Sequence, residues 1–253
     1  MRSLKKNDNL SLDIVVIGVV AILLVAIFVI GKNTINKNKQ ASKLNVKSFN
    51  KSQYSISNPN SVWVIVNKQR PISPLNFIPQ TLIPPSVSLA KLPETSTITL
   101  QPIATQALSS MFLYAKQQKI NLFLADGYKS YNYQQSLYDG YSLSKGTQYA
   151  DDLAFRPGYN ESQIGLTVDI SNKNNSCYHQ NCFDNTVEGK WLLANAYRFG
   201  FILRYPKNDE KYTGMTYEPW LFRYVGYSLS SELYTKNQPL EQFFNLPSAI
   251  SYK

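Results

Sequence analysis

The chain's only two cysteines lie close together in the sequence, with its single histidine between them. The stretch from Cys177 to Cys182, with His179 inside it, could form either a small disulfide loop or a fragment of a metal site. Zinc sites usually space paired ligands by two to four residues and take a second pair from elsewhere, whereas these residues supply three ligands at most. We therefore favour the disulfide, which suits an oxidising compartment.

Four other segments concentrate polar, glycine and aromatic residues that could hold a ligand or move protons. They are residues 126–131 with Gln134, residues 156–170, residues 200–206 and residues 217–226. A purely structural interpretation competes with this one, because large aromatic residues usually belong to the core and arginines to struts or the surface. It applies to Trp191, Phe201, Tyr205, Trp220, Arg204 and Arg223.

In order and spacing, these four segments resemble the VanY-type zinc D-alanyl-D-alanine carboxypeptidases. Residues 67–71 are similar to the strand that opens that family's domain, so the resemblance covers roughly residues 61–227. It implies an α+β fold of the hedgehog/DD-peptidase kind, with a small antiparallel sheet and helices packed around it. It also implies a role at the peptidoglycan of the cell wall.

The family holds zinc with a histidine and an aspartate seven residues apart, and with a second histidine three residues after a catalytic glutamate. The resemblance assigns the aspartate to Asp169 and the glutamate to Glu218, with Gly165 at the glycine inside the first run. Ser162 and Leu221 occupy the two histidine positions. A serine hydroxyl is a poor zinc ligand and leucine has no lone pair, so no cofactor is expected here, although active members use zinc.

Other positions of the family pattern also differ. Lys129 stands where the family has an arginine that stabilises the oxyanion, and Asp126 replaces a serine nearby. A lysine keeps the charge but loses the planar, bidentate guanidinium. The resemblance further implies that Gln134, Arg156 and Tyr159 line the groove that takes the stem peptide.

The expected function is that of a catalytically inactive, carboxypeptidase-like protein that binds peptidoglycan stem peptides or an envelope protein. One alternative is an active metallo-carboxypeptidase in which Asp169, Glu161 and Glu218 supply unusual oxygen ligands. Another is a structural interaction domain that needs no groove chemistry. His179 matches neither histidine position of the family.

The formal net charge of +10 argues weakly for nucleic acid, because it is concentrated at one end of the chain. Residues 1–51 hold 9 Lys and Arg against 2 Asp, a net +7, whereas residues 52–253 hold 17 against 14 acidic residues, a net +3. Lysines beside an apolar segment more simply serve anionic lipids or an anionic cell wall. No nucleic-acid partner is expected.

From Ile14 to Ile30 every residue is apolar or glycine, which is close to the length that spans a bilayer. We expect a cytoplasmic N-terminus (1–13), a transmembrane anchor (14–31), a flexible linker (32–60) and one domain (61–253) outside the cytoplasm. Lysines on both sides of the anchor leave its orientation open under the positive-inside rule, so the expected wall-facing chemistry decides it.

Hydrophobic periodicity and turn residues predict three helices and four strands in the domain. The helices cover residues 100–119, 133–143 and 187–199, the last closed by Gly200. The strands cover residues 61–66, 120–124, 166–170 and 222–225.

Overall fold

The computed structural model describes residues 49–92 and 97–253. The chain divides into two units, Met1–Phe49 and Asn50–Lys253, and the fold below is that of the second. The predicted anchor lies outside the described residues. Within the described ranges, no helix is long and apolar enough to cross a membrane.

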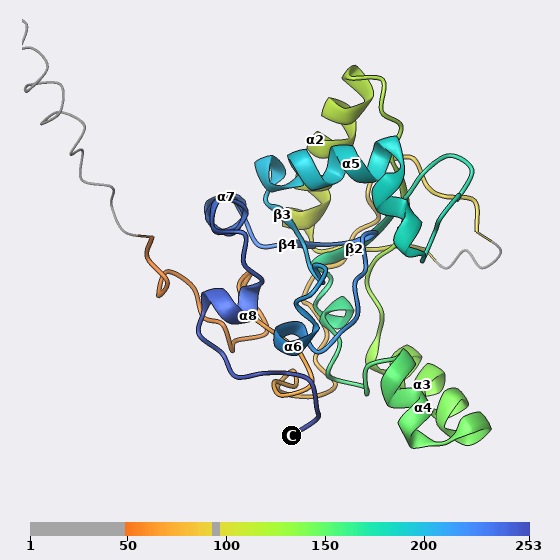
Figure 1. The fold of residues 1–253 in the computed structure, drawn as a ribbon, viewed down its shortest axis with the longest axis vertical. Coiled ribbons are helices and arrows are strands. Elements are labelled where there is room, and N and C mark those ends of the chain that lie inside the picture. Colours follow the sequence, from red (N-terminus) through yellow and green to blue (C-terminus); the bar gives the residue numbers. More distant parts are fainter. Residues whose placement is uncertain (1–48, 93–96) are drawn as a thin grey trace, which may run out of the picture. The chain divides into compact units, whose positions relative to one another are not determined.

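A four-stranded antiparallel sheet forms the centre of the domain (Figure 1), as the predicted α+β class requires. Its order is β1-β2-β4-β3, and β2 is buried along its whole length. The strands are β1 (Phe123–Asp126), β2 (Thr167–Ser171), β3 (Phe201–Leu203) and β4 (Leu221–Tyr224). Three of the four were predicted, with boundaries shifted by up to three residues.

Seven α-helices and three short 3-10 helices surround the sheet in the described residues. They are α2 (Pro102–Gln117), α3 (Tyr131–Lys145), α4 (Thr147–Leu153), α5 (Val187–Asn195), α6 (Glu210–Thr213), α7 (Tyr227–Lys236) and α8 (Leu240–Phe243), with η1 (Glu161–Ile164), η2 (Asn181–Asn185) and η3 (Ala196–Phe199). The three predicted helices correspond to α2, α3 and α5 with η3. Helices α3 and α4 form a hairpin that projects away from the sheet (Figure 1).

Local sequence signals explain where the predicted helices start and stop. Pro102 stands in the first turn of α2, where its missing N–H costs no hydrogen bond. The hydroxyls of Ser130 and Thr186 cap α3 and α5 by accepting backbone N–H groups. Gly200 ends η3 with φ 85°, a left-handed conformation that favours glycine.

Helix α2 packs its apolar face into the core beside the sheet. Ala104, Leu108, Met111 and Ala115, at helical spacing, are fully buried in one cluster with residues of β2 and β4. Among the large aromatic residues, Trp191, Phe201 and Tyr205 are buried, whereas Trp220 is only half-buried.

The predicted strand at residues 61–66 is wrong. The segment is buried, with Trp63 and Val66 each 1% exposed, but it does not join the sheet. Part of its backbone bonds to side chains instead: Arg223 Nη2 donates to the carbonyls of Val62 and Val64 at 3.0 and 3.1 Å. Residues 50–60, expected in the linker, also belong to the compact unit, and Tyr54 packs edge-on against Trp63 at 5.0 Å.

A fully buried ion network connects the segment before the sheet to the C-terminal helices. Arg204 Nε and Arg223 Nη1 each lie 2.8 Å from Glu161 Oε2, and Arg204 Nη2 lies 2.6 Å from Glu241 Oε1. The backbone N–H of Val66 donates to Glu161 at 3.1 Å. Burial alone would raise the pKa of Glu161, but the charges of the two arginines outweigh this effect and hold the pKa below its usual value. The arginines are therefore struts rather than surface charges.

Arg204→Met should destabilise the domain by about 3–5 kcal/mol, because buried Glu161 would keep only Arg223 and buried Glu241 would lose its paired arginine. Chemical denaturation of the full chain measures this. Glu232→Gln is the control, since the exposed Glu232–Lys236 pair should contribute less than about 1 kcal/mol. Equal effects of the two substitutions would show that the network does not stabilise the fold.

Candidate functional site

Strand register brings together residues that are far apart in the sequence. Asp169 on the central strand β2 faces Asp126 on β1 and Leu221 on β4. Residues directly opposite each other on neighbouring strands project to the same face of a sheet. Asp169, to which the resemblance assigns a zinc-ligand position, therefore forms one row across three strands with Asp126 and Leu221.

Ser162, which stands at the other histidine position that the resemblance implies, lies on η1 and contacts Thr167 of β2. Its carbonyl accepts the backbone N–H of Lys129 and of Gly165, each at 3.2 Å, and its hydroxyl accepts from Thr167 at 3.2 Å. Gly165 ends η1 with φ 66°, a conformation in which glycine is favoured. The local turn thus keeps the spacing of the family motif although the histidine is absent.

Lys129 pairs with its neighbour Asp126 at 2.8 Å. Burial alone would lower the pKa of Lys129, but the charges of Asp169 and Asp126 outweigh this effect and hold the pKa above its usual value. Burial also raises the pKa of Asp126, with Lys129 acting in the opposite direction. The lysine ammonium is therefore largely balanced by carboxylates before any ligand arrives.

A cavity of about 650 Å³ lies against this ion pair. Three tyrosines, Tyr128, Tyr133 and Tyr178, line it together with Asp126 and Lys129. The remaining lining side chains are aliphatic or carry hydroxyls: Leu89, Ala90, Leu92, Thr97, Ile98, Thr99, Ala125 and Ser130. Such a mixture of apolar walls and a few polar groups is typical of a pocket for a small peptide.

His179, which the sequence analysis did not place in the site, contacts Asp169. Its Nε2 lies 3.0 Å from Asp169 Oδ2. The imidazole stacks on Tyr178 at 3.9 Å between ring centroids, and Trp220 lies 5.2 Å away. The family pattern could not reveal this contact, because it depends on a loop that folds back. The one available signal was that the chain's only histidine lies between its two cysteines.

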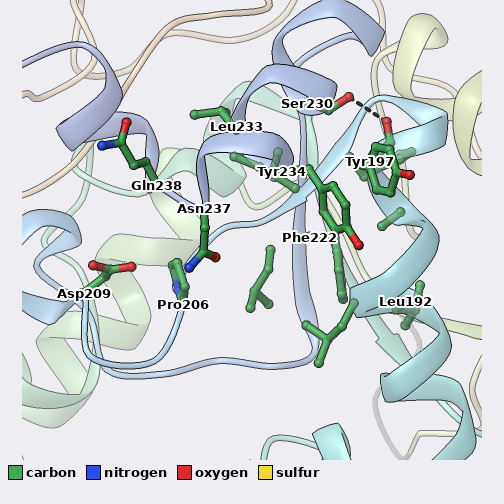
Figure 2. A pocket seen from close by; sticks show the side chains of 15 residues that line it. Leu192, Tyr197, Pro206, Asp209, Phe222, Ser230, Leu233, Tyr234, Asn237 and Gln238 are labelled. Carbon is green, nitrogen blue, oxygen red and sulfur yellow. Dashed lines mark hydrogen bonds between the residues drawn. The ribbon is translucent and has the colours of Figure 1, made fainter.

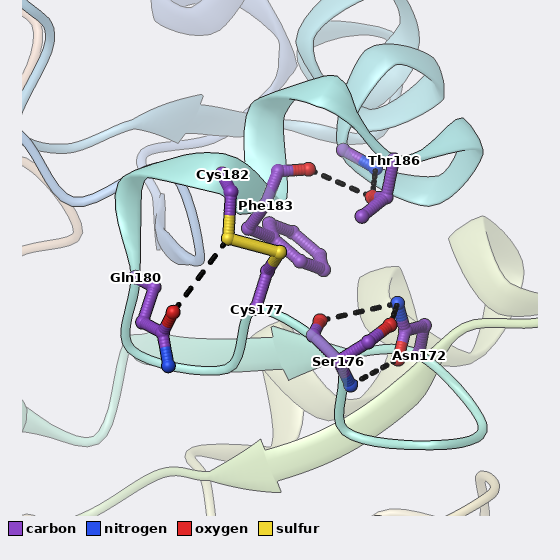
Figure 3. The surroundings of a disulfide bond; sticks show 8 residues. Asn172, Ser176, Cys177, Gln180, Cys182, Phe183 and Thr186 are labelled. Atoms are coloured by element: carbon purple, nitrogen blue, oxygen red, sulfur yellow. Dashed lines mark hydrogen bonds between the residues drawn. A yellow bond between two sulfur atoms is a disulfide. The ribbon is translucent and has the colours of Figure 1, made fainter.

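The loop that carries His179 is closed by a disulfide between Cys177 and Cys182, with Cα atoms 5.4 Å apart (Figure 3). The favoured interpretation of the cysteines therefore agrees with the structure. Their sulfur atoms are bonded to each other and are not available as metal ligands.

Glu218 is half-buried, and its carboxyl group interacts electrostatically with Asp169 and Lys129. Burial, reinforced by the charge of Asp169 and opposed by Lys129, raises the pKa of Glu218 to about 8. The carboxyl group is then mostly protonated at neutral pH. In that state it cannot accept a proton as a general base.

The residues present do not fit a zinc site with three protein ligands. Ser162 engages its hydroxyl with Thr167, Leu221 has no donor atom, and Asp169 already contacts an imidazole. Throughout residues 49–92 and 97–253, no group of three or more His, Cys, Asp or Glu could hold a metal ion. Glu161, considered as an oxygen ligand, is excluded because both of its carboxylate oxygens pair with arginines.

The three predicted groove residues lie in two different places. Gln134 is only 3% exposed and donates to the carbonyl of Lys129 at 2.9 Å, so it supports the wall of the pocket from behind. Arg156 pairs with Asp151 at 2.7 Å and lies over the ring of Tyr252, against which Tyr159 also packs. Contact with a peptide stays a prediction for Arg156 and Tyr159.

A second, apolar groove of about 530 Å³ lies between α5, β3 and α7 (Figure 2). Leu192, Phe222, Leu233 and Tyr234 are among its lining residues, and Ser230 donates to the carbonyl of Tyr197 at its edge. None of the predicted site residues lines this groove. Of the predicted site residues, Lys129 lines the first cavity, together with its partner Asp126.

Comparison with known proteins agrees with this arrangement. The profile of the family described as VanY, D-alanyl-D-alanine carboxypeptidase, matches residues 97–227. The chain is 36% identical over 190 residues to the putative carboxypeptidase YodJ of Bacillus subtilis (strain 168), which covers 75% of this chain and 69% of that protein.

Two solved structures have the same fold. The LdcB LD-carboxypeptidase, whose structure concerns peptidoglycan recognition, aligns with a TM-score of 0.70 at 36% identity, covering 74% of this chain and 87% of that one. A mutant of the vancomycin-resistance D,D-pentapeptidase VanY in complex with Zn(II) aligns with a TM-score of 0.58 at 28% identity. The alignment covers 73% of this chain and 99% of that one. The domain thus has the fold of the bacterial cell-wall carboxypeptidases. The chain belongs to the VanY D-alanyl-D-alanine carboxypeptidase family.

Glu218→Gln should change how stability depends on pH. The pKa of Glu218 is raised from 4.5 to about 8. Its contribution to the free energy of unfolding is therefore full below pH 4.5 and is lost as the pH rises through 8. Glutamine does not titrate. Between pH 4.5 and pH 9 the free energy of unfolding of the wild type should fall by about 1–3 kcal/mol more than that of the variant, because the carboxyl group is only partly shielded from solvent. Urea denaturation with a chelator present measures this, and parallel pH profiles would contradict the buried, protonated carboxyl group.

Proposed function

We propose that this chain is a non-hydrolysing member of the VanY family that binds peptidoglycan stem peptides in the cavity beside Asp126 and Lys129. The observation that carries the proposal is the state of Asp169, the one family zinc ligand that remains. It contacts His179 at 3.0 Å, while its two partner positions hold Ser162 and Leu221.

The electrostatics of the site support the same proposal. Without a metal ion, no bound water acquires a pKa near 7, and hydrolysis at neutral pH lacks a nucleophile. Glu218 is mostly protonated at neutral pH and cannot compensate as a base. A cavity of about 650 Å³, lined by tyrosines and aliphatic residues, adjoins the Asp126–Lys129 pair and supports the peptide-binding part of the proposal.

We further propose that the domain lies outside the cytoplasm and is held at the membrane by residues 14–31. The apolar run from Ile14 to Ile30 and the disulfide of the Cys177–Cys182 loop support this location. An envelope protein is a second possible partner. Labelling of thiols in intact cells after mild reduction tests the location, and labelling that requires a broken membrane would contradict it.

The full chain should bind a pentapeptide stem by calorimetry but release no D-alanine, with or without added zinc. Tyr133→Ala should weaken binding by about tenfold, because Tyr133 lines the cavity. Tyr234→Ala is the matched control: Tyr133 is 50% exposed and Tyr234 is 51% exposed, but Tyr234 lines the other groove. Release of D-alanine that Glu218→Gln abolishes would overturn the proposal.

Replacing Ser162 and Leu221 together by histidine should restore zinc binding, while either replacement alone should not. The register that places position 221 opposite Asp169, and the turn that holds position 162 beside Lys129, are both intact. Two imidazoles and a carboxylate would complete a three-ligand site, whereas one imidazole leaves too few ligands. Calorimetric titration with zinc tests this. If the double variant binds zinc no more tightly than the wild type, positions 162, 169 and 221 do not surround a single point.

A further inference from the structure

The loop between Asn172 and Cys182 fixes the position of His179 through several independent constraints. Asn175, Cys177 and His179 have φ values of 52°, 62° and 52°, which residues other than glycine rarely adopt. The Cys177–Cys182 disulfide closes the loop (Figure 3). Asn172 clamps its start, accepting the Ser176 N–H at 2.9 Å and donating to the Ser176 hydroxyl at 2.8 Å. Backbone strain of this kind persists only where surrounding contacts determine it, and it often marks a functional site.

These constraints converge on one contact, between the imidazole of His179 and Asp169. A carboxylate can only accept a hydrogen bond, so Nε2 donates to Asp169 Oδ2 across 3.0 Å. The ring stacks on Tyr178 at 3.9 Å, and on another side it faces Trp220, two residues after Glu218, at 5.2 Å. The loop therefore holds the imidazole between the two segments of the former metal site.

We propose that His179, presented by the Cys177–Cys182 loop, takes the place of the metal at Asp169 and thereby closes the site to metal ions. This inference rests on the proposed loss of zinc and names the residue responsible for keeping Asp169 occupied. His179 is a positioning residue here: it fixes the carboxylate of Asp169 through the 3.0 Å contact, and its neighbour Tyr178 lines the cavity beside Asp126 and Lys129.

The competing interpretation is that His179 replaces a lost histidine as a ligand, because two donors on one ion also lie about 3 Å apart. One observation favours the pairing: the described residues provide no third ligand for such an ion.

Zinc titration of the full chain separates the two interpretations. The starting protein carries Ser162→His and Leu221→His, and His179→Ala is then added to it. If the imidazole occupies Asp169, its removal should raise the zinc affinity by about tenfold, since zinc no longer competes with a charge-assisted hydrogen bond. Opening the loop with Cys177→Ser and Cys182→Ser should also raise the zinc affinity. Gln180→Ala, at an exposed position in the same loop, should leave the affinity unchanged.

Lower or unchanged affinity after His179→Ala would overturn the proposal, and so would a failure of both proteins to bind zinc. A second measurement avoids these variants, because the wild-type chain has a single histidine and gives one imidazole signal set in nitrogen NMR. That signal should not move on addition of one equivalent of zinc, and a shift typical of a metal-bound ring nitrogen would overturn the proposal. Neither readout uses a peptide, so failure of peptide binding is recognised separately.

Discussion

The buried network of Glu161, Arg204, Arg223 and Glu241 is the interaction on which the geometry of this domain depends. Glu161 stands directly before Ser162, so the arginines that neutralise Glu161 also fix the turn that carries one ligand position of the family. Arg223 lies on β4, two residues after Leu221, and bonds to the backbone of residues 62–64. Such charges are costly to bury unless all are paired, which makes the network intolerant of partial loss. The scaffold of the site is therefore fixed independently of any metal.

This separation between scaffold and chemistry explains how the site could change without loss of the fold. Where structural metal sites supply folding energy, losing the metal unfolds the protein. Here the row of Asp126, Asp169 and Leu221 is set by strand register, and η1 is set by buried ions. The side chains around Asp169 could then be replaced. The site contains an ion pair, an imidazole–carboxylate contact and a glutamate with a raised pKa, and a tyrosine-lined cavity adjoins the ion pair.

Much of the fold could be predicted from the sequence. Apolar spacing and end signals indicate the helices α2 and α3, and short apolar runs indicate the strands β2 and β4. Residues 61–66 were misread since a buried apolar run looks like a strand, and nothing local shows that arginine and glutamate side chains take its backbone hydrogen bonds. Strand β3 is only three residues long, and α7 and α8 lie beyond the region of resemblance. The site residues on paired strands were found through family spacing. His179 was missed, because three left-handed residues and a disulfide determine its direction, and no periodicity encodes those.

If the protein's own imidazole rather than zinc occupies Asp169, the chain should be isolated almost free of zinc. The metal content of the full chain, purified from cells grown with ample zinc and dialysed without chelator, measures this. We expect far less than one zinc per chain, and no difference between the wild type and Asp169→Ala. One zinc per chain that disappears in Asp169→Ala would show that Asp169 binds zinc.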